Sequence, residues 1–308
     1  MFRTILVPLD GTPFAEAALP LATRLGRPSR ARVRLLMAHQ PAAVVAGLGG
    51  LPTPDAGIDL DARAREETYL GSVADSLRTA DGVPVELRHP DGPPGMAVCD
   101  EVRQDRPDLV VMATHGRGAL GRFWLGSVAH HVIRQVDVPV LLVHPRRTGE
   151  PPDLPAHPGI LVPLDLSPFA ERVLEPVAVL SRALGAHLEL LHVVELGPAV
   201  SEPMVVNLIP EDPVLTEVRR TDALRRLEDI ATRLRARGLT VSTHVVVGSS
   251  AAAGVIDALS ERRCDMVAMS THGAGGMRRL FLGSVADKVV RASARPVLVV
   301  RPAQLPGE

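Results

Sequence analysis

Thr114-His115-Gly116-Arg117-Gly118 stands between a short apolar run, Leu109–Met112, and a second glycine motif, Gly126-Ser127-Val128. An unbroken run of branched apolar residues is typical of a strand that is buried on both faces of a parallel sheet. A helical pattern begins at the second motif and covers residues 127–136. The sequence therefore predicts a strand, a glycine-rich loop and a helix in direct succession.

The same construction occurs a second time in the chain. Thr271-His272-Gly273-Ala274-Gly275 follows the apolar run Met266–Met269, and Gly283-Ser284-Val285 comes at the same spacing, before a helical pattern over 284–292. Glycines let a backbone approach a ligand closely, and a helix start offers unpaired N–H groups with a partial positive charge. Together they form a cradle for phosphate. Gly and Ser also cap helices that bind nothing, but two copies at one spacing favour a ligand.

Length and charge narrow the class of protein. At 308 residues the chain is long enough for two domains, each with its own core. The net charge of −1, with Arg interspersed among Asp and Glu, is unlike a nucleic-acid-binding surface. Lys288 is the only lysine, which excludes a Gly-x4-Gly-Lys phosphate loop and a Schiff-base lysine. No apolar run approaches membrane-spanning length. We therefore expect neither a membrane nor a nucleic-acid partner.

The two cysteines indicate a reducing compartment. Cys99 and Cys264 fall at different places in the two halves and form no Cys-x-x-Cys pair, so we interpret them as buried thiols. The strand predicted at the N-terminus contains Pro8 and runs into Asp10, which is unlike a signal peptide. We therefore expect a cytoplasmic protein.

An internal repeat dominates the chain. Ile5-Leu6-Val7-Pro8-Leu9-Asp10 returns as Ile160-Leu161-Val162-Pro163-Leu164-Asp165, and the segments 125–129 and 139–143 return at 282–286 and 296–300. A period of this length indicates a duplicated domain rather than a solenoid of short repeats. Five prolines interrupt residues 144–158. We predict a first domain at 1–145, a Pro-rich linker at 146–158, a second domain at 159–302 and a tail at 303–308.

Within each half, predicted strands alternate with predicted helices. Such alternation is typical of an α/β fold whose parallel sheet carries helices on both faces. In the second half, Asp165, His192, Gly248, Ser270 and Pro296 mark strand ends or starts. In the first half the pattern predicts strands at 4–9, 33–39, 83–88, 109–113 and 140–143, and helices at 13–25, 60–80, 96–105 and 127–136.

Long loops follow the second strand of each half. Residues 41–57 and 196–213 are apolar and rich in Pro and Gly. Loops of this length are uncommon unless they cover a site or a partner. Exposing apolar side chains such as Val44 and Met204 is costly. This favours a lid or a contact surface over a disordered excursion.

Acidic residues follow the first strand of each half. In open α/β sheets, ligands bind beyond the carboxyl ends of the strands where the strand order reverses. Asp10 and Asp165 would face the same crevice there as the glycine loops. A carboxylate repels phosphate unless a cation lies between them, so Asp10 is suited to accept hydrogen bonds from an adenosine amine or a ribose hydroxyl, or to hold Mg²⁺. It can also cap the helix that begins at Thr12-Pro13, and the roles do not exclude each other.

The histidines invite a catalytic interpretation that the sequence does not support. No nucleophile with an orienting acid can be assigned near His115 or His272, and no second His stands at metal-ligand spacing from them. We interpret both as loop-positioning or phosphate-contacting residues. His39 and His192 end the second strands and are interpreted as structural. We assign no catalytic residue and no protein metal site.

In this order the motifs resemble the universal stress protein family in its tandem two-domain form. The resemblance spans essentially the whole chain and is carried by Val7–Asp10, Met112–Gly118, Leu125–Val128 and Pro139–Val143, with their second-half equivalents. It implies, in each half, a Rossmann-like domain similar to the adenine nucleotide alpha hydrolases, with a five-stranded parallel sheet of order 3-2-1-4-5. In one branch it implies ATP, held by Gly-x2-Gly-x9-Gly-Ser/Thr.

Most of the ATP pattern is present in both halves. The first glycine is replaced by Ala113 and by Ser270, which permit close approach but put the affinity in doubt. The remaining positions match the pattern with Gly116, Gly126 and Ser127 in the first half and with Gly273, Gly283 and Ser284 in the second.

The resemblance also implies how the two pockets differ. The position against adenine is Gln40 in the first half and Val193 in the second. Arg117 is suited to contact phosphate, and Ala274 in its place predicts weaker binding in the second pocket. ATP is the expected ligand, with AMP or ADP as alternatives. The implied contact residues are Pro8, Leu9, Asp10, Gln40, Met112, Ala113, His115, Gly116, Arg117, Gly118, Gly126, Ser127, Val128, Pro163, Leu164, Asp165, Val193, Met269, Ser270, His272, Gly273, Gly275, Gly283, Ser284 and Val285.

The last strand of each half, Val140–Val143 and Val297–Val300, resembles the dimerisation edge of the family. Pairing of the two halves through these strands would satisfy their exposed edges within one chain. A homodimer of two such chains is left open.

The sequence thus predicts an ATP-binding stress-response protein that acts as a nucleotide-dependent regulator or sensor. Slow ATP hydrolysis or autophosphorylation could accompany binding, although no base is assigned. The first alternative is an interaction module of the non-nucleotide branch. The second is an ATP-pyrophosphatase-type enzyme, which commonly carries a Ser-Gly-Gly loop after strand one. Asp10-Gly11-Thr12-Pro13 disfavours that class.

Overall fold

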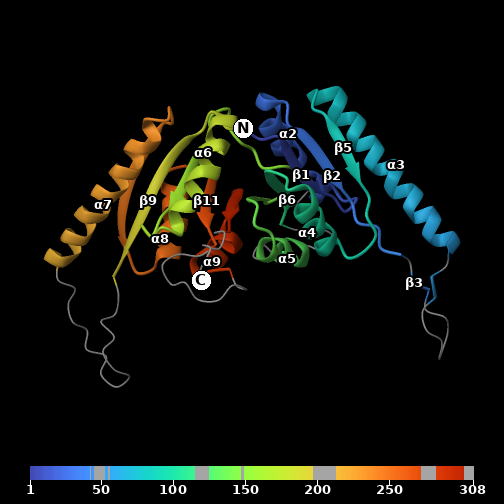
Figure 1. The fold of residues 1–308 in the computed structure, drawn as a ribbon. Helices are drawn as coiled ribbons and strands as arrows, with labels where there is room; N and C mark the ends of the chain where they lie inside the picture. Colours follow the sequence, from blue (N-terminus) through green and yellow to red (C-terminus); the bar gives the residue numbers. More distant parts are fainter. Residues whose placement is uncertain are drawn as a thin grey trace, which may run out of the picture. The chain divides into compact units, whose positions relative to one another are not determined.

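Two units divide the chain between Pro152 and Asp153, a point inside the predicted linker. The structure is a computed structural model that describes residues 1–41, 43–44, 53–54, 56–114, 125–146, 149–196, 213–271 and 282–301, with the backbone alone at 43–44, 53–54 and 56–58. Each unit alternates strands with helices, as the apolar patterns predict (Figure 1).

Unit 1 begins with its central strand and adds the others outward. Its strands are β1 (Thr4–Pro8), β2 (Arg32–Leu36), the short β3 (Ala43–Val44) and β4 (Thr53–Pro54), β5 (Val85–Arg88), β6 (Leu109–Ala113) and β7 (Val140–Val143). Its helices are α1 (Pro13–Glu16), α2 (Leu19–Gly26), a 3-10 turn (Arg27–Ser29), α3 (Ala56–Asp81), α4 (Pro94–Asp105) and α5 (Ser127–Gln135).

Unit 2 repeats this order without the short pair β3–β4 among its described residues. Its strands are β8 (Gly159–Pro163), β9 (His187–Glu195), β10 (Val241–Gly248), β11 (Met266–Ser270) and β12 (Val297–Val300). Its helices are a 3-10 turn (Ala170–Val173), α6 (Leu174–Leu184), α7 (Pro213–Arg235), α8 (Ala251–Glu261) and α9 (Ser284–Ala292).

The strand order confirms the predicted fold class. Unit 1 has the order β5-β2-β1-β6-β7 and unit 2 the order β10-β9-β8-β11-β12, each a parallel sheet of order 3-2-1-4-5. Right-handed crossovers place the helices before and after the reversal on opposite faces. The reversal lies between β1 and β6 in unit 1 and between β8 and β11 in unit 2. These are the places where open α/β sheets bind ligands.

Some predicted bounds were wrong, for local reasons. The helix predicted over 13–25 is split into α1 and α2, because Pro20 has no N–H to continue the ladder. The first-half strand predicted to end at His39 ends at Leu36, and His39 forms an isolated bridge with Asp91. His192 does not end β9, because β10 continues to pair with it as far as Glu195.

A buried charge cluster in unit 1 replaces apolar packing between β2 and α4. The Arg34 side chain is 6% exposed and donates from Nη1 to Glu101 and to Asp105, both at 2.8 Å, and from Nη2 to Glu86 at 2.8 Å. Burial alone lowers the pKa of this guanidinium, but the Glu86 hydrogen bond and the neighbouring carboxylate charges outweigh it and raise the pKa. Arg34 therefore stays charged inside the unit.

Unit 2 carries the opposite charge at the equivalent position. Leu6 pairs with Arg34 in unit 1, and its repeat equivalent Leu161 pairs with Glu189 in unit 2. Oε2 of Glu189 lies 2.6 Å from Nε2 of His244, and Oε1 lies 3.5 Å from Nε2 of His187. The two sheets thus have the same strand pairing, but one interior position carries a positive side chain in unit 1 and a negative side chain in unit 2.

Both cysteines are free and buried, which confirms their predicted interpretation as buried thiols. Burial raises the pKa of the Cys264 thiol to about 12, helped by the charges of Glu189 and Asp265. Burial also raises the pKa of Cys99.

We expect Cys264 in the folded protein to be alkylated roughly 1,000-fold more slowly than in urea at pH 8, because the thiolate is the reacting species and burial raises the pKa of this thiol to about 12. Peptide mass spectrometry of iodoacetamide time courses measures both rates. Equal rates in buffer and in urea would contradict the assignment of Cys264 to the core.

The long loops predicted as lids lie mostly outside the described residues. Of residues 41–57 the structure describes the antiparallel pair β3–β4 and the start of α3. Among the helices that are described, none combines the length and the apolar character that a membrane crossing requires.

Candidate functional site

The carboxyl ends of β8 and β11 meet at the strand-order reversal of unit 2. The two strands pair directly, with Ile160 opposite Met266 and Leu161 opposite Val267. Asp165 follows β8 and Thr271 follows β11, so the polar residues after both strands leave the same edge of the sheet. This is the crevice in which the sequence predicts a nucleotide.

A cavity of about 770 Å³ lies at this edge. Small-molecule sites have volumes of about 300–1,000 Å³. Its walls include these residues predicted to contact nucleotide: Pro163, Leu164, Asp165, Val193, Met269, Ser270, Gly283, Ser284 and Val285. The structure therefore brings together residues that are up to 122 positions apart in the sequence, between Pro163 and Val285.

The start of α9 faces this cavity without a side-chain cap. Gly283 is the N-cap residue, and the first intrahelical bond runs from the Asp287 N–H to its carbonyl at 2.9 Å. The amides of Ser284, Val285 and Ala286 come before that bond, and all three residues line the cavity. Helix starts leave such amides to be satisfied by other partners. They are suited to an anion.

The start of α8 lies on the same cavity and provides a contrast. Ala251 and Val255 of α8 are cavity residues, but Ser250 Oγ accepts from the Ala253 N–H at 3.3 Å and a Glu195 carboxylate oxygen accepts from the Ala251 N–H. Side chains of the chain itself therefore cap α8. Of these two helix starts, only that of α9 has a glycine in the capping position, where no side chain competes with a ligand.

Asp165 shapes the turn that leads from β8 into the cavity wall. Its Oδ1 accepts from the Ser167 N–H at 2.9 Å, and Ser167 Oγ accepts from the Ala170 N–H at 3.2 Å. Leu166, the residue between Asp165 and Ser167, has φ 62°, a left-handed conformation that is rare for a branched side chain. The Leu166 carbonyl accepts from Arg226 at 2.8 Å, which holds this strained turn. Asp165 thus holds the turn itself, and Ser167 accepts from the first residue of the following 3-10 turn.

Two further side chains of the wall are fixed by internal hydrogen bonds. Ser270, which stands in place of the first glycine of the pattern, donates its hydroxyl to the Phe169 carbonyl at 2.9 Å. His192 Nδ1 lies 2.8 Å from the Leu164 carbonyl. A carbonyl can only accept, so Nδ1 carries the proton. Both side chains stabilise the wall through contacts within unit 2.

Helix α7 contributes wall residues that the sequence patterns did not indicate. Arg219, Asp222, Ala223 and Arg226 line the cavity together with Glu195 of β9. They belong to a helix of alternating charges, which is typical of an exposed surface and carries no ligand motif. The signal that could have identified them is the buried stripe of α7, because its register shows which side chains face the sheet.

The same local geometry recurs in unit 1. Gly126 is the N-cap of α5 with φ −57° and ψ 151°, the values that Gly283 also has. Its N–H donates to the Thr114 carbonyl at 2.7 Å, as that of Gly283 does to Thr271. Asp10 Oδ1 accepts from the Thr12 N–H at 3.0 Å, which repeats the turn of Asp165. The duplicated sequence therefore produces duplicated backbone geometry.

The strand register corrects the residue equivalence at the predicted adenine position. The Leu9 N–H donates to the Leu36 carbonyl and the Leu164 N–H to the Leu191 carbonyl, both at 2.8 Å. Counting on from these bonds, Val193 corresponds to Ala38. The equivalence with Gln40 was wrong, because His39 was aligned with His192 by residue type. Gln40 corresponds to Glu195, and the unit 1 residue equivalent to Val193 is the small, apolar Ala38.

Part of the predicted site lies outside the described residues. These positions are the loop residues His115, Gly116, Arg117, Gly118, His272, Gly273 and Gly275.

Comparisons with known proteins agree with the architecture. The model of the universal stress protein family matches residues 1–144 and 159–301. A universal stress protein of Mycolicibacterium smegmatis is 28% identical over 306 residues, which cover 97% of each chain. A universal stress protein of Mycobacterium tuberculosis is 32% identical over 195 residues. That match covers 63% of this chain and spans 62% of the length of the relative.

Solved structures share the fold. The crystal structure of a universal stress protein from Archaeoglobus fulgidus has a TM-score of 0.66 and 23% identity, and the match covers 97% of this chain and 96% of that one. A structure from Pseudomonas aeruginosa, described as a putative universal stress protein, has a TM-score of 0.64 and 15% identity, with 98% and 94% covered.

Proposed function

Because the chain belongs to the universal stress protein family, with one such domain in each half, we propose that it binds an adenine nucleotide, in the first place ATP, and acts as a nucleotide-dependent regulator or sensor. One observation carries this proposal. The cavity of unit 2 is lined by an uncapped helix start, a carboxylate and apolar side chains. A nucleotide presents the matching sequence of phosphate, sugar and base.

In this proposal the phosphates lie against the start of α9. The amides of Ser284, Val285 and Ala286 would donate to phosphate oxygens, and the helix dipole would add a favourable charge. The glycines of the preceding loop would extend this contact, with His272 as a further phosphate-contacting side chain. In unit 1 the corresponding roles fall to Gly126, Ser127 and Val128.

The nucleoside would occupy the opposite end of the cavity. Asp165 would accept hydrogen bonds from the ribose or the adenine amine, and Val193 would pack against the base. In unit 1 Asp10 and Ala38, the equivalents of Asp165 and Val193, would take these roles. Mg²⁺ would reduce the repulsion between the carboxylate and the phosphates and take oxygen ligands from both.

A regulatory role fits the described wall better than a catalytic one. His192, the histidine of the cavity wall, uses Nδ1 to bind the Leu164 carbonyl, and no nucleophile is paired with a base among the described wall residues. Slow hydrolysis or autophosphorylation would then accompany binding without being the main activity. The buried free thiols support a cytoplasmic location as part of this proposal.

Two predictions about association remain: pairing of the two halves of one chain through their last strands, and a homodimer of two chains. The strands concerned are β7 and β12, the fifth in each sheet order. Sedimentation of the full chain would show whether the homodimer forms.

Gentle purification followed by mass spectrometry of the released small molecules tests the proposed function. We expect an adenine nucleotide at up to two equivalents per chain, and ATP added to stripped protein should give heat in a calorimetric titration. Because Ala274 replaces Arg117, the second pocket is expected to bind more weakly. A stripped chain that gives no heat with ATP, ADP or AMP would instead support the interaction-module alternative.

A further inference from the structure

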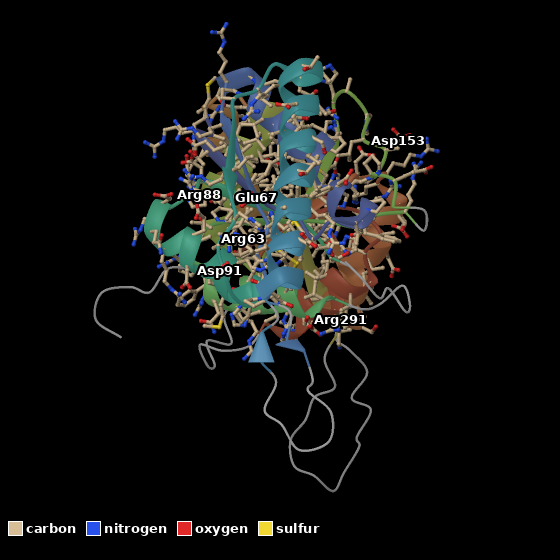
Figure 2. The ribbon with its side chains drawn as sticks, turned by 90° about the vertical axis from the view of Figure 1, so that its right-hand side faces the viewer. Arg63, Glu67, Arg88, Asp91, Asp153 and Arg291 are labelled. Carbon is tan, nitrogen blue, oxygen red and sulfur yellow. The ribbon has the colours of Figure 1, made fainter. Side chains whose placement is uncertain are left out.

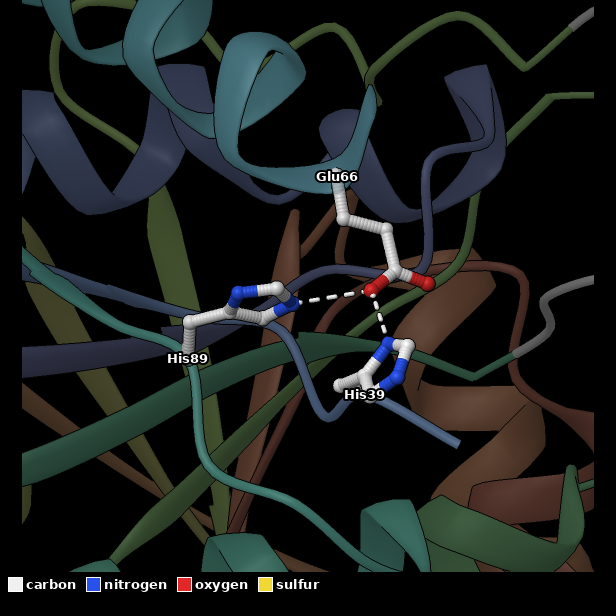
Figure 3. A group of neighbouring side chains, drawn as sticks. All are labelled: His39, Glu66 and His89. Carbon is white, nitrogen blue, oxygen red and sulfur yellow. Dashed lines mark hydrogen bonds and ion pairs between the residues drawn. The ribbon is translucent and has the colours of Figure 1, made fainter. Parts of the chain in front are cut away.

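Two histidines of unit 1 point at one carboxylate oxygen. His39 Nδ1 lies 2.7 Å and His89 Nε2 lies 2.9 Å from Oε2 of Glu66, which comes from α3 (Figure 3). The ligand atoms of the three residues all lie within 4.8 Å of one another. The side chains of His39, His89 and Glu66 are 1%, 11% and 22% exposed. The cluster is therefore largely shielded from solvent.

Further carboxylates stand behind both rings. Asp59 Oδ1 lies 3.2 Å from His39 Nε2, the ring nitrogen that faces away from Glu66. His89 Nδ1 is buried, has no hydrogen-bond partner among the described residues, and lies 3.6 Å from Glu67 Oε1. Histidines that ligate a metal commonly direct their second N–H at a carboxylate, which fixes the ring and strengthens the ligand. Asp59 and Glu67 are placed for this supporting role.

In unit 2 the positions equivalent to the three residues of the cluster are occupied by apolar residues. The strand register makes Val194 the equivalent of His39 and Val245 the equivalent of His89. Aligning the buried stripes of α3 and α7 on Leu70 and Leu227 makes Ala223 the equivalent of Glu66. Three apolar residues in one copy thus correspond to three ligand-type residues in the other. The fold can therefore pack at these positions without any polar residue.

We propose that His39, Glu66 and His89 bind a divalent transition-metal ion, and zinc fits these ligands best. Two imidazoles and one carboxylate form a common zinc ligand set, which leaves a fourth position for water or another ligand. Zinc bonds of about 2.0–2.2 Å place tetrahedral ligand atoms roughly 3.3 Å apart. Each ring nitrogen therefore has to move away from Glu66 Oε2 by only about half an ångström. The ion takes the place of the ring protons that now point at Glu66.

The ion would join three elements that the chain connects through long segments. His39 follows β2, His89 follows β5 and Glu66 belongs to α3. Arg63 already binds this region together, because it donates to Asp91 at 2.6 Å (Figure 2). His39 also follows directly on Ala38, the proposed adenine wall of unit 1. The ion would therefore fix the position of that wall, and this site does not depend on whether a nucleotide binds.

Zinc titration of the tag-free, full-length chain, stripped with a chelator, tests the proposal. We expect one zinc equivalent assigned to this cluster, and Co²⁺ in its place should give the visible absorption of a tetrahedral site. The triple variant His39→Val, Glu66→Ala, His89→Val should lose that equivalent. It should still fold, because unit 2 carries the same residue types there. Asp59→Asn should weaken zinc binding by about 10–100-fold, as loss of an outer carboxylate does.

Unit 2 offers a matched control. Glu189 lies near His187 and His244, the same residue types, but the two rings face different oxygens of the carboxylate. His244→Gln should leave the zinc equivalent of the first cluster in place. The proposal is overturned if wild-type protein takes up no zinc, or if the triple variant keeps every equivalent that wild type binds. Loss of that equivalent in His244→Gln alone would overturn it as well.

Discussion

Replacing Gly283 by valine is expected to weaken ATP binding in unit 2 by at least about 100-fold. Each hydrogen bond to a charged group contributes about 1.5–3 kcal/mol, and loss of two such amide contacts costs about 3–6 kcal/mol. Every 1.4 kcal/mol corresponds to a factor of about ten in affinity. The valine side chain would stand at the cavity wall, beside the amides of Ser284 and Val285. Calorimetric titration with ATP measures the loss.

The backbone of this position allows a clean comparison. Gly283 has φ −57° and ψ 151°, values that any residue can adopt, so the variant should fold. Gly126→Val makes the same change in unit 1 and should remove ATP binding to unit 1 while leaving ATP binding to unit 2 unchanged. The double variant should bind no nucleotide. If Gly283→Val titrates like wild type while its circular dichroism is unchanged, the phosphates do not lie at α9.

Replacing Arg34 by leucine should destabilise unit 1 by about 3 kcal/mol, because removal of one partner leaves a buried charge uncompensated. Glu101 is only 9% exposed and would lose its 2.8 Å contact with Arg34. Arg88 lies 3.2 Å from the same carboxylate and would supply partial compensation, so we expect a value at the low end of the range of about 3–5 kcal/mol. Urea unfolding followed by circular dichroism measures the change.

Arg32 supplies the matched control for this experiment. It lies in the same strand, is 48% exposed and pairs with Glu86 at 3.0 Å. Exposed pairs of this kind contribute about 0–1 kcal/mol, so Arg32→Leu should change stability little. The double variant Arg34→Leu, Glu101→Leu should recover part of the loss, since no carboxylate at Glu101 is left to desolvate. Equal losses for Arg32→Leu and Arg34→Leu would contradict the buried-charge explanation.

The fold was predictable because its signals are local and occur twice. Leu109–Ala113 and Val140–Val143 form strands with the predicted bounds, since branched apolar runs in a parallel sheet are buried on both faces. Much of the cavity wall was predictable for a related reason. Gly283 and Asp165 act through helix capping and turn chemistry, which depend on a few neighbouring residues in the sequence.

Features that depend on register between distant segments could not be predicted. Alignment of His39 with His192 by residue type made Gln40 the equivalent of Val193, whereas two backbone hydrogen bonds make Ala38 its equivalent. The α7 side chains of the cavity were missed because no ligand motif marks them, and their place beside the cavity depends on how the buried stripe of α7 packs against the sheet. The ligands of the proposed metal site come from three separate segments, so no short spacing motif contains them.

The opposite charges at Arg34 and Glu189 have a consequence for the history of the gene. Exchange of a short coding segment between the two repeats would place an arginine beside the histidines that surround Glu189, or a glutamate beside the carboxylates that surround Arg34. Either hybrid domain would be less stable, because the buried charge would lack an opposite charge to pair with. Selection against such hybrids would limit gene conversion between the repeats and let the interior of each domain diverge while both keep one backbone.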